Sequence, residues 1–187
     1  IQFDDQEISK LRVGDIARLG MLRTFQQTRI YSKMDCVDNM QISVSHRQDS
    51  KSSIFASRRG EIRDRAEHLL EFVGLYSKRS LISGDLSFGQ QKLLEFAMAL
   101  MNEPKVLLLD EPTAGINPTL INGLIDRLRR ANEELGITLC VIEHNMRVIM
   151  NLASHIYCLS NGKMLADGKP ETLQNDTRVI DAYLGGH

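Results

Sequence analysis

Two short aliphatic runs restrict the fold of this chain more than any other feature. The first is VLLLD at 106–110, and the second is ITLCVIEH at 137–144. Continuous aliphatic runs of this length are typical of strands that are covered on both faces in a parallel sheet. Segments with helical periodicity lie around them, and strands that alternate with helices indicate an α/β fold. The sequence therefore predicts an α/β domain with a largely parallel sheet.

Apolar residues at helical spacing predict the helices of this domain. In one of them Ile62, Ala66, Leu69 and Val73 recur between charged residues, and Gly74 follows as a C-cap. Gly136 has the same place after a later helix. The predicted helices cover 9–19, 62–73, 93–101, 118–135 and 145–153.

Other segments predict strands and loops. The chain begins with the end of a strand, and a short strand leads into RTFQQ at 23–27. Residues 43–59 are rich in serine, arginine and lysine without periodicity, which predicts a loop. An Asn-Gly pair at 161–162 lies between two apolar runs and predicts two strands joined by a tight turn. A polar helical tail is expected from residue 169.

Composition narrows the class of protein. The 187 residues suit one domain with a full core. A net charge of −1 argues against nucleic-acid binding through general positive charge, and no apolar run approaches the roughly 20 residues that span a bilayer. Cys36, Cys140 and Cys158 form no C-x-x-C pair. They are expected to be reduced thiols, as in a cytosolic protein, and buried as small hydrophobic side chains.

Two adjacent acids and a histidine follow the aliphatic runs. Asp110 and Glu111 would lie at the carboxyl end of a parallel strand, where α/β folds bind ligands. One carboxylate suits Mg²⁺, and the other can orient or deprotonate a water molecule. His144 ends the second run and could donate to a phosphate oxygen. The alternatives are a pair of solvated acids and a capping or packed histidine.

A serine and a glycine open the helix before the first run. In LSFGQQ, Ser87 suits the N-cap position and Gly89 permits close approach of the backbone. A helix N-terminus with a serine hydroxyl is a typical anion site. Taken alone, however, the motif is better explained by simple helix capping.

Five motifs in order resemble those of the nucleotide-binding ATPase domain of ABC transporters. They are RTFQ (Q-loop), LSFGQQ (signature), VLLLDEP (Walker B and catalytic glutamate), AGIN (D-loop) and His144 (switch histidine). The resemblance covers nearly the whole chain and implies a P-loop NTPase-like fold with a helical subdomain. Phe88 stands where the commonest signature has glycine. Asn117 stands where many D-loops have aspartate, so an ionic role is not expected there.

The resemblance implies that one group of residues acts on a bound Mg-ATP. Asp110 and Gln26 would hold Mg²⁺, and Gln26 would also sense the nucleotide and couple to the membrane subunit. Glu111 would polarise the attacking water. His144 would contact the γ-phosphate.

A second group would act on a different ATP molecule. Ser87, Gly89 and Gln90 would reach the γ-phosphate held by the other subunit of a head-to-tail dimer. Asn117, in the D-loop, is also expected to bind nucleotide. The two ATP molecules would thus be enclosed between two ATPase subunits, which can be identical or different chains. The signature would supply positioned dipoles to the charge that develops during phosphoryl transfer.

The motifs also resemble one group of ABC ATPases in particular. RTFQ, LSFGQQ, DEPTAGINP, IEHNM and the terminal AYLG are similar to the ATPase subunits of branched-chain amino acid importers. ATPases of urea importers and of lipopolysaccharide export are related alternatives. The implied partners are transmembrane permease subunits and, indirectly, a periplasmic or extracellular binding protein. The implied location is the cytoplasm, at the inner face of the cell membrane.

The P-loop pattern G-x-x-x-x-G-K-[ST] is absent from the 187 residues. In the family this loop lies upstream of the position that matches Ile1, so the chain is expected to be one partial domain, 1–187, that lacks its N-terminal part. Within it, 27–85 is expected to form a helical subdomain, 86–168 the motif region and 169–187 the tail. The alternatives are a non-hydrolysing module that docks on a membrane subunit or an intact partner, and an ABC ATPase that does not serve transport.

Overall fold

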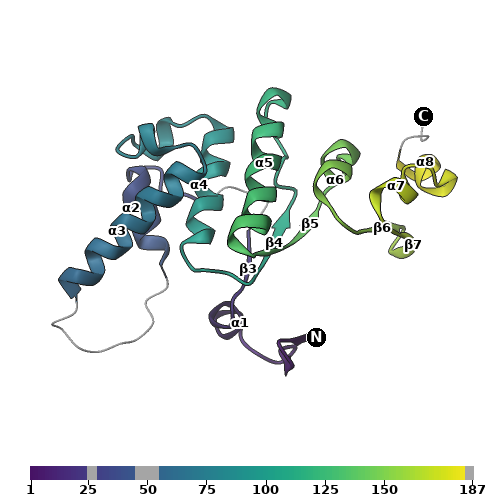
Figure 1. Ribbon diagram of the computed structural model, residues 1–187, viewed down its shortest axis with the longest axis horizontal. Coiled ribbons are helices and arrows are strands. Elements are labelled where there is room, and N and C mark those ends of the chain that lie inside the picture. The colour runs from purple at the N-terminus through teal and green to yellow at the C-terminus, as the bar shows by residue number, and fades with distance from the viewer. Residues whose placement is uncertain (25–28, 45–54, 184–187) are drawn as a thin grey trace.

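The structure has a central body of helices and strands from which both ends of the chain extend (Figure 1). It is a computed structural model that describes residues 1–24, 29–44 and 55–183, without the side chains of residues 55–58. Within these ranges, no helix has both the length and the apolar character needed to cross a membrane.

The central sheet has three parallel strands. Their order is β3 (Met21–Arg23), β4 (Val106–Asp110) and β5 (Thr138–Ile142). In this register Leu107 lies between Leu22 and Leu139, and both connections cross over through helices. The predicted α/β fold with a parallel sheet is confirmed.

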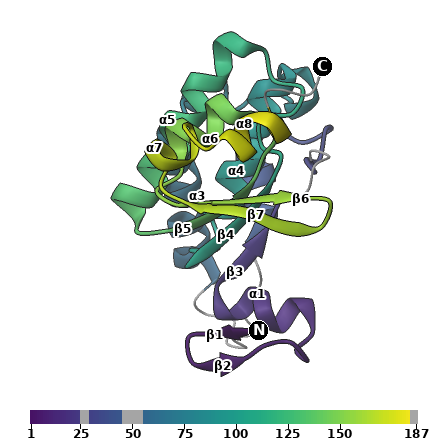
Figure 2. The same ribbon diagram turned by 90° about the vertical axis from the view of Figure 1, so that its right-hand side faces the viewer.

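Two helices, α4 (Phe88–Leu100) and α5 (Pro118–Leu135), cover one face of this sheet. Alternate side chains of β4, Leu107 and Leu109, are buried in one core cluster with residues of both helices. Figure 2 shows the two helices on the same side of the strands. Gly136 ends α5 in the left-handed conformation, as predicted. This packing fixes where the carboxyl ends of the strands lie.

The opposite face of the sheet is open at β5. Thr138, Cys140 and Ile142 point to this face and are exposed, and Ile142 is 62% exposed. The prediction that both aliphatic strands are covered on both faces is therefore wrong for β5. An apolar run shows that a strand tolerates burial, but it does not show whether a second layer lies on it.

A helical region precedes α4 in the chain. It contains α2 (Cys36–Ser43), α3 (Phe55–Phe72) and two 3-10 turns, η1 (Tyr76–Lys78) and η2 (Ser83–Asp85). The predicted loop at 43–59 is wrong at its end, because residues 55–59 belong to α3. Among the side chains of α3 that the structure describes, buried ones such as Ala66 and Leu70 lie in its later turns. Residues 45–54 of the predicted loop lie outside the described residues.

A fully buried asparagine, Asn39 on α2, organises this region. Its side-chain oxygen accepts a hydrogen bond from the Tyr31 N–H at 2.7 Å. Its amide donates to the carbonyls of Tyr31 and Asp35 at 3.1 and 2.8 Å and to Ser83 Oγ at 3.1 Å. One side chain thus joins the segment before α2, α2 itself and η2.

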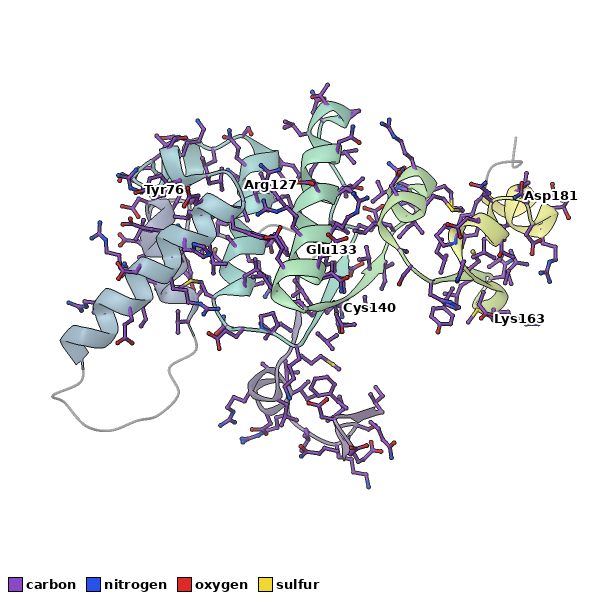
Figure 3. The ribbon with its side chains drawn as sticks, viewed as in Figure 1. Tyr76, Arg127, Glu133, Cys140, Lys163 and Asp181 are labelled. Atoms are coloured by element: carbon purple, nitrogen blue, oxygen red, sulfur yellow. The ribbon has the colours of Figure 1, made fainter. Side chains whose placement is uncertain are left out.

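Arg127 joins the helical region to α5. Its Nε donates to the Val73 carbonyl at 2.7 Å, and its Nη1 donates to the Gly123 carbonyl at 2.7 Å (Figure 3). Gly74 follows α3 with φ +78°, as the predicted C-cap requires. A Cβ at Gly74 would lie 2.6 Å from Arg127 Nη2, so glycine also leaves room for the guanidinium.

The N-terminal residues form a small hairpin and a short helix. The hairpin pairs β1 (Gln2–Phe3) with β2 (Gln6–Glu7), and α1 (Val13–Leu19) follows. The helix predicted at 9–19 therefore begins later than expected. Gly20 ends α1 with φ +105° and leads directly into β3.

The C-terminal elements, at residues 146–183, pack around a second, smaller apolar cluster. α6 (Met146–Leu152) is followed by an antiparallel pair, β6 (Ile156–Ser160) and β7 (Lys163–Gly168). The predicted turn at Asn161 and Gly162 is confirmed, with φ +50° and +73°. The short helices α7 (Pro170–Leu173) and α8 (Thr177–Tyr183) complete a second apolar cluster with α6 and the strands.

The cysteines differ in exposure, so the prediction that all three are buried is wrong for Cys140. Cys36 and Cys158 are buried, whereas Cys140 lies on the open face of β5 (Figure 3). Burial raises the pKa of the Cys36 thiol to about 11 and also raises the pKa of Cys158.

We expect Cys140 to react first with iodoacetamide in the native protein, because thiolates are the reactive form and Cys36 and Cys158 are held as thiols. Mass spectrometry after short labelling at neutral pH measures the modified positions. Urea should make all three sites reactive. Labelling of Cys36 at the rate of Cys140 in the native protein would contradict this expectation.

Candidate functional site

The carboxyl ends of β4 and β5 bring the predicted acid and histidine residues to one edge of the sheet. Asp110 is aligned with Ile142. Glu111 continues the pairing, because its N–H donates to the Ile142 carbonyl at 2.9 Å. Its carbonyl then accepts from the Ala114 N–H at 3.0 Å and begins a turn. The strand end is therefore a shaped loop, which weighs against two loosely solvated acids.

The backbone of Glu111 has φ +46°, in the left-handed region. This conformation costs a non-glycine residue about 1–2 kcal/mol. Strained residues of this kind persist where surrounding contacts hold them, and they concentrate at functional sites. Here the backbone bonds to Ile142 and Ala114 hold the residue in this conformation.

His144 lies beside Glu111. Its Nδ1 is 3.3 Å from Glu111 Oε1, and its side chain is 73% exposed. The histidine is therefore not a packed core residue, which was one alternative. An exposed imidazole next to an acid at a strand end is free to meet a ligand from solvent.

Asp110 is paired with an arginine from the neighbouring strand. Arg23 Nη2 donates to Asp110 Oδ2 at 2.8 Å, and the two side chains are 55% and 28% exposed. This contact joins residues that are 87 positions apart in the chain. Arg23 could not be predicted as a site residue, because nothing local in RTFQ indicates a partner so distant.

Glu143 is a second residue that the sequence analysis missed. Its Oε1 accepts hydrogen bonds from the Thr113 N–H at 3.0 Å and from the Thr113 hydroxyl, and its Oε2 accepts from the Asn145 N–H at 3.3 Å. It ties the loop after β4 to the start of α6. An acid two residues before Asn145, the N-cap of α6, was the available signal.

Ser87 and Gln90 form a capping box at the start of α4. Ser87 Oγ accepts from the Gln90 N–H at 3.4 Å, and Gln90 Oε1 accepts from the Ser87 N–H at 3.1 Å. The predicted N-cap is confirmed. Ser87 is exposed, so the helix N-terminus faces solvent.

The start of α4 packs on the loop that leads into α5. Gly89 is buried, and a Cβ there would lie 3.1 Å from Leu120 Cδ1. Gly115 has φ +74°, and a Cβ there would lie 2.9 Å from the Phe88 ring. Both glycines therefore permit close packing of α4 on this loop. Asn117 caps α5, because its Oδ1 accepts from the Thr119 N–H at 3.0 Å.

We expect Gly115→Ala to lower the free energy of unfolding by about 2 kcal/mol, from left-handed strain and overlap with Phe88. Gly136→Ala is the matched control, since its φ of +68° is similar but a Cβ meets nothing within 4 Å. It should cost only about 1 kcal/mol. Adding Phe88→Ala should remove the difference in urea denaturation. Equal losses in the two glycine variants would show that the Phe88 contact is unimportant.

The predicted site residues thus fall into two groups. Asp110, Glu111 and His144 share the sheet edge, and Ser87 and Gln90 bond to each other at the start of α4. Gln26 lies outside the described residues. The roles of all these residues in nucleotide binding stay predictions.

The donor set near Asp110 fits Mg²⁺ only together with other oxygen ligands. Within the described ranges no group of three or more His, Cys, Asp or Glu side chains could hold a metal ion. Asp110 nevertheless already binds a cation, the Arg23 guanidinium. Mg²⁺ is commonly held by one or two carboxylates, several waters and the phosphates of a nucleotide. A site made of protein ligands alone is therefore not supported by the described residues, and Mg²⁺ binding at Asp110 stays a prediction.

Solved structures identify the class of this fold. The ADP conformation of MJ1267, an ATP-binding cassette of an ABC transporter, superposes with a TM-score of 0.81 at 28% identity, over 98% of this chain and 75% of MJ1267. The cbiO1 protein from Clostridium perfringens, part of the ABC transporter complex cbiONQ, gives 0.80 at 25% identity, over 98% and 72%. The fold is that of an ATP-binding cassette.

Sequence comparison gives the family. Residues 1–114 match the family described as ABC transporter, and 163–187 match the one described as branched-chain amino acid ATP-binding cassette transporter. The chain belongs to the ABC transporter family, which confirms the resemblance seen in its motifs.

Two curated relatives carry names from branched-chain amino acid transport. BraF of Pseudomonas aeruginosa, a high-affinity branched-chain amino acid transport ATP-binding protein, is 35% identical over 99% of this chain and 75% of BraF. LivG of Escherichia coli, which has the same description, is 34% identical over 97% of this chain and 74% of LivG.

Proposed function

We propose that this chain belongs to an ATP-binding and ATP-hydrolysing subunit that powers the import of branched-chain amino acids. The observation that carries the proposal is the acid pair at the end of β4 with His144 Nδ1 3.3 Å from Glu111 Oε1. The similarity to BraF and LivG supports the transported class of substrate.

The residues at the carboxyl edge of the sheet have separate roles toward one nucleotide. Asp110, together with Gln26, holds Mg²⁺, which neutralises phosphate charge when it is bound. Glu111 orients and polarises the attacking water, and its carboxylate lies beside the His144 imidazole. His144 donates to the γ-phosphate from an exposed position beside Glu111.

The corner at the start of α4 acts on a second nucleotide, in a partner ATPase subunit. Ser87, Gly89 and Gln90 present a solvent-facing helix N-terminus to the γ-phosphate that the partner holds. Asn117 contributes from the adjoining loop, and the contact between Phe88 and Gly115 makes the corner and this loop one packed unit.

The subunit works at the inner face of the cell membrane, with transmembrane permease subunits as partners. The segment between Gln26 and Ser87 meets the permease. The permease in turn receives amino acids from a periplasmic or extracellular binding protein.

ATP binding by these 187 residues alone should be poor, because they contain no P-loop to surround the phosphates with backbone N–H groups and a lysine. Calorimetry with Mg-ATP measures this directly. The positive control is a BraF hybrid, in which the 187 residues replace the matching region of BraF. We expect the hybrid to bind and hydrolyse ATP. Micromolar binding by the 187 residues alone would overturn this part of the proposal, and an inactive, folded hybrid would overturn the assigned chemistry.

A further inference from the structure

Arg23 and Asp110 are placed together by the sheet itself. Arg23 ends β3 and is aligned with Leu108, and Asp110 lies two residues further along β4 on the same face. The Thr24 N–H donates to the Leu108 carbonyl at 2.9 Å, so the pairing continues past Arg23. Parallel strands end at the same edge, and the guanidinium reaches along that edge to Asp110.

We propose that Arg23 is an internal counter-ion of Asp110 that competes with Mg²⁺ for this carboxylate. The inference rests on the proposed role of Asp110 as a metal ligand. Arg23 Nη2 donates to Asp110 Oδ2 at 2.8 Å, which is an oxygen that a metal ion would use. A guanidinium keeps its charge at all accessible pH values, so it neutralises the acid whenever the metal is absent.

A metal ion can replace the Arg23 guanidinium at Asp110. More than half of the Arg23 side chain is exposed, and exposed ion pairs are weak because solvent screens them. A divalent ion at Asp110 would repel the guanidinium, which can turn into solvent. Arg23 thus sets how much metal, or Mg-nucleotide, is needed before Asp110 is released. It is a positioning residue and does not take part in the chemistry.

A structural role would predict the opposite effect on the metal. If Arg23 merely orients Asp110 so that its other oxygen binds the ion, its loss should weaken metal binding. If Arg23 competes, its loss should strengthen metal binding. The sign of the change therefore separates the two roles.

The test is a Mn²⁺ titration of the BraF hybrid with a non-hydrolysable ATP analogue bound, because the nucleotide phosphates supply the oxygen ligands that Asp110 alone lacks. Paramagnetic broadening of the backbone amide NMR signals of residues 108–112 follows the binding. Arg23→Gln should bind Mn²⁺ about fivefold more tightly than the unsubstituted hybrid, the size expected for loss of one weak ion pair and one nearby positive charge. Arg18→Gln is the matched control. It removes the same charge from α1, where Arg18 pairs with Asp15.

Three further variants make every outcome decisive. Arg23→Lys keeps the charge and should bind Mn²⁺ much as the unsubstituted hybrid does. Arg23→Met removes the charge, and it replaces Arg23→Gln in the comparison with Arg18→Gln if Arg23→Gln does not fold. Asp110→Asn should weaken Mn²⁺ binding, because it removes the protein carboxylate from the shared site. If it does not, Asp110 is not the ligand and the proposed function loses its metal site. If it does, but Arg23→Gln binds no more tightly than Arg18→Gln, only the competition is wrong.

Discussion

Replacing Glu111 by glutamine in the BraF hybrid is expected to lower ATP turnover by about 10²-fold or more, while ATP binding stays largely intact. A carboxamide has nearly the shape of the carboxylate but cannot polarise or deprotonate water. Glutamine and glutamate have the same energetic cost at φ +46°, so the loop should keep its conformation. Phosphate release measures turnover, and calorimetry measures nucleotide affinity.

Glu103 provides a matched control for this substitution. It too is a glutamate in the left-handed region, with φ +49°, and its side chain is exposed and paired with Arg65 on α3. Glu103→Gln should leave turnover unchanged. If Glu111→Gln turns over ATP at the rate of Glu103→Gln, then Glu111 does not activate the water.

Replacing Asn39 by alanine is expected to lower the free energy of unfolding by about 2–4 kcal/mol, because it removes all the hydrogen bonds of one fully buried side chain at once. The Tyr31 N–H loses its acceptor, and the carbonyls of Tyr31 and Asp35 lose a donor. Ser83 Oγ keeps its own bond to the Tyr31 carbonyl at 2.9 Å but loses the amide that donates to it. Urea denaturation measures the loss.

Asn151→Ala tests whether this effect comes from burial. Asn151 is exposed on α6, and its amide makes one hydrogen bond, to the Arg147 carbonyl at 2.7 Å, among the described contacts. The same change of residue should cost no more than about 0.5 kcal/mol there. Comparable losses at both positions would mean that the network around Asn39 does not stabilise the helical region.

Local patterns were sufficient for the elements whose residues carry their own signal. The aliphatic run at 106–110 became a parallel strand, Ser87 became an N-cap, and Asn161 with Gly162 became a tight turn. In each case the burial, the cap or the turn depends on residues that are close in the chain. The helix α2 was not foreseen, since its stability depends on a buried polar side chain that reaches Ser83, 44 residues away.

The candidate site was predictable in its residues but not in its contacts. The positions of Asp110, Glu111 and His144 at strand ends follow from the order of strands and helices. The pairing of Asp110 with Arg23, however, depends on β3 and β4 being neighbours in the sheet. The tie between Glu143 and Thr113 depends in the same way on the register of β4 and β5. Tertiary neighbours of this kind have no local trace in the sequence.

In the proposed mechanism, the acids Asp110 and Glu111 serve one nucleotide, and Ser87 at the start of α4 serves a different one. Ser87→Asp in a hybrid that also carries Glu111→Gln tests it most directly, because aspartate keeps the helix cap but places a negative charge where a partner's phosphate would lie. Calorimetry on the separate subunit and gel filtration with ATP measure binding and pairing. We expect unchanged ATP affinity and loss of the ATP-dependent dimer. A subunit whose own ATP affinity falls with Ser87→Asp would contradict this mechanism.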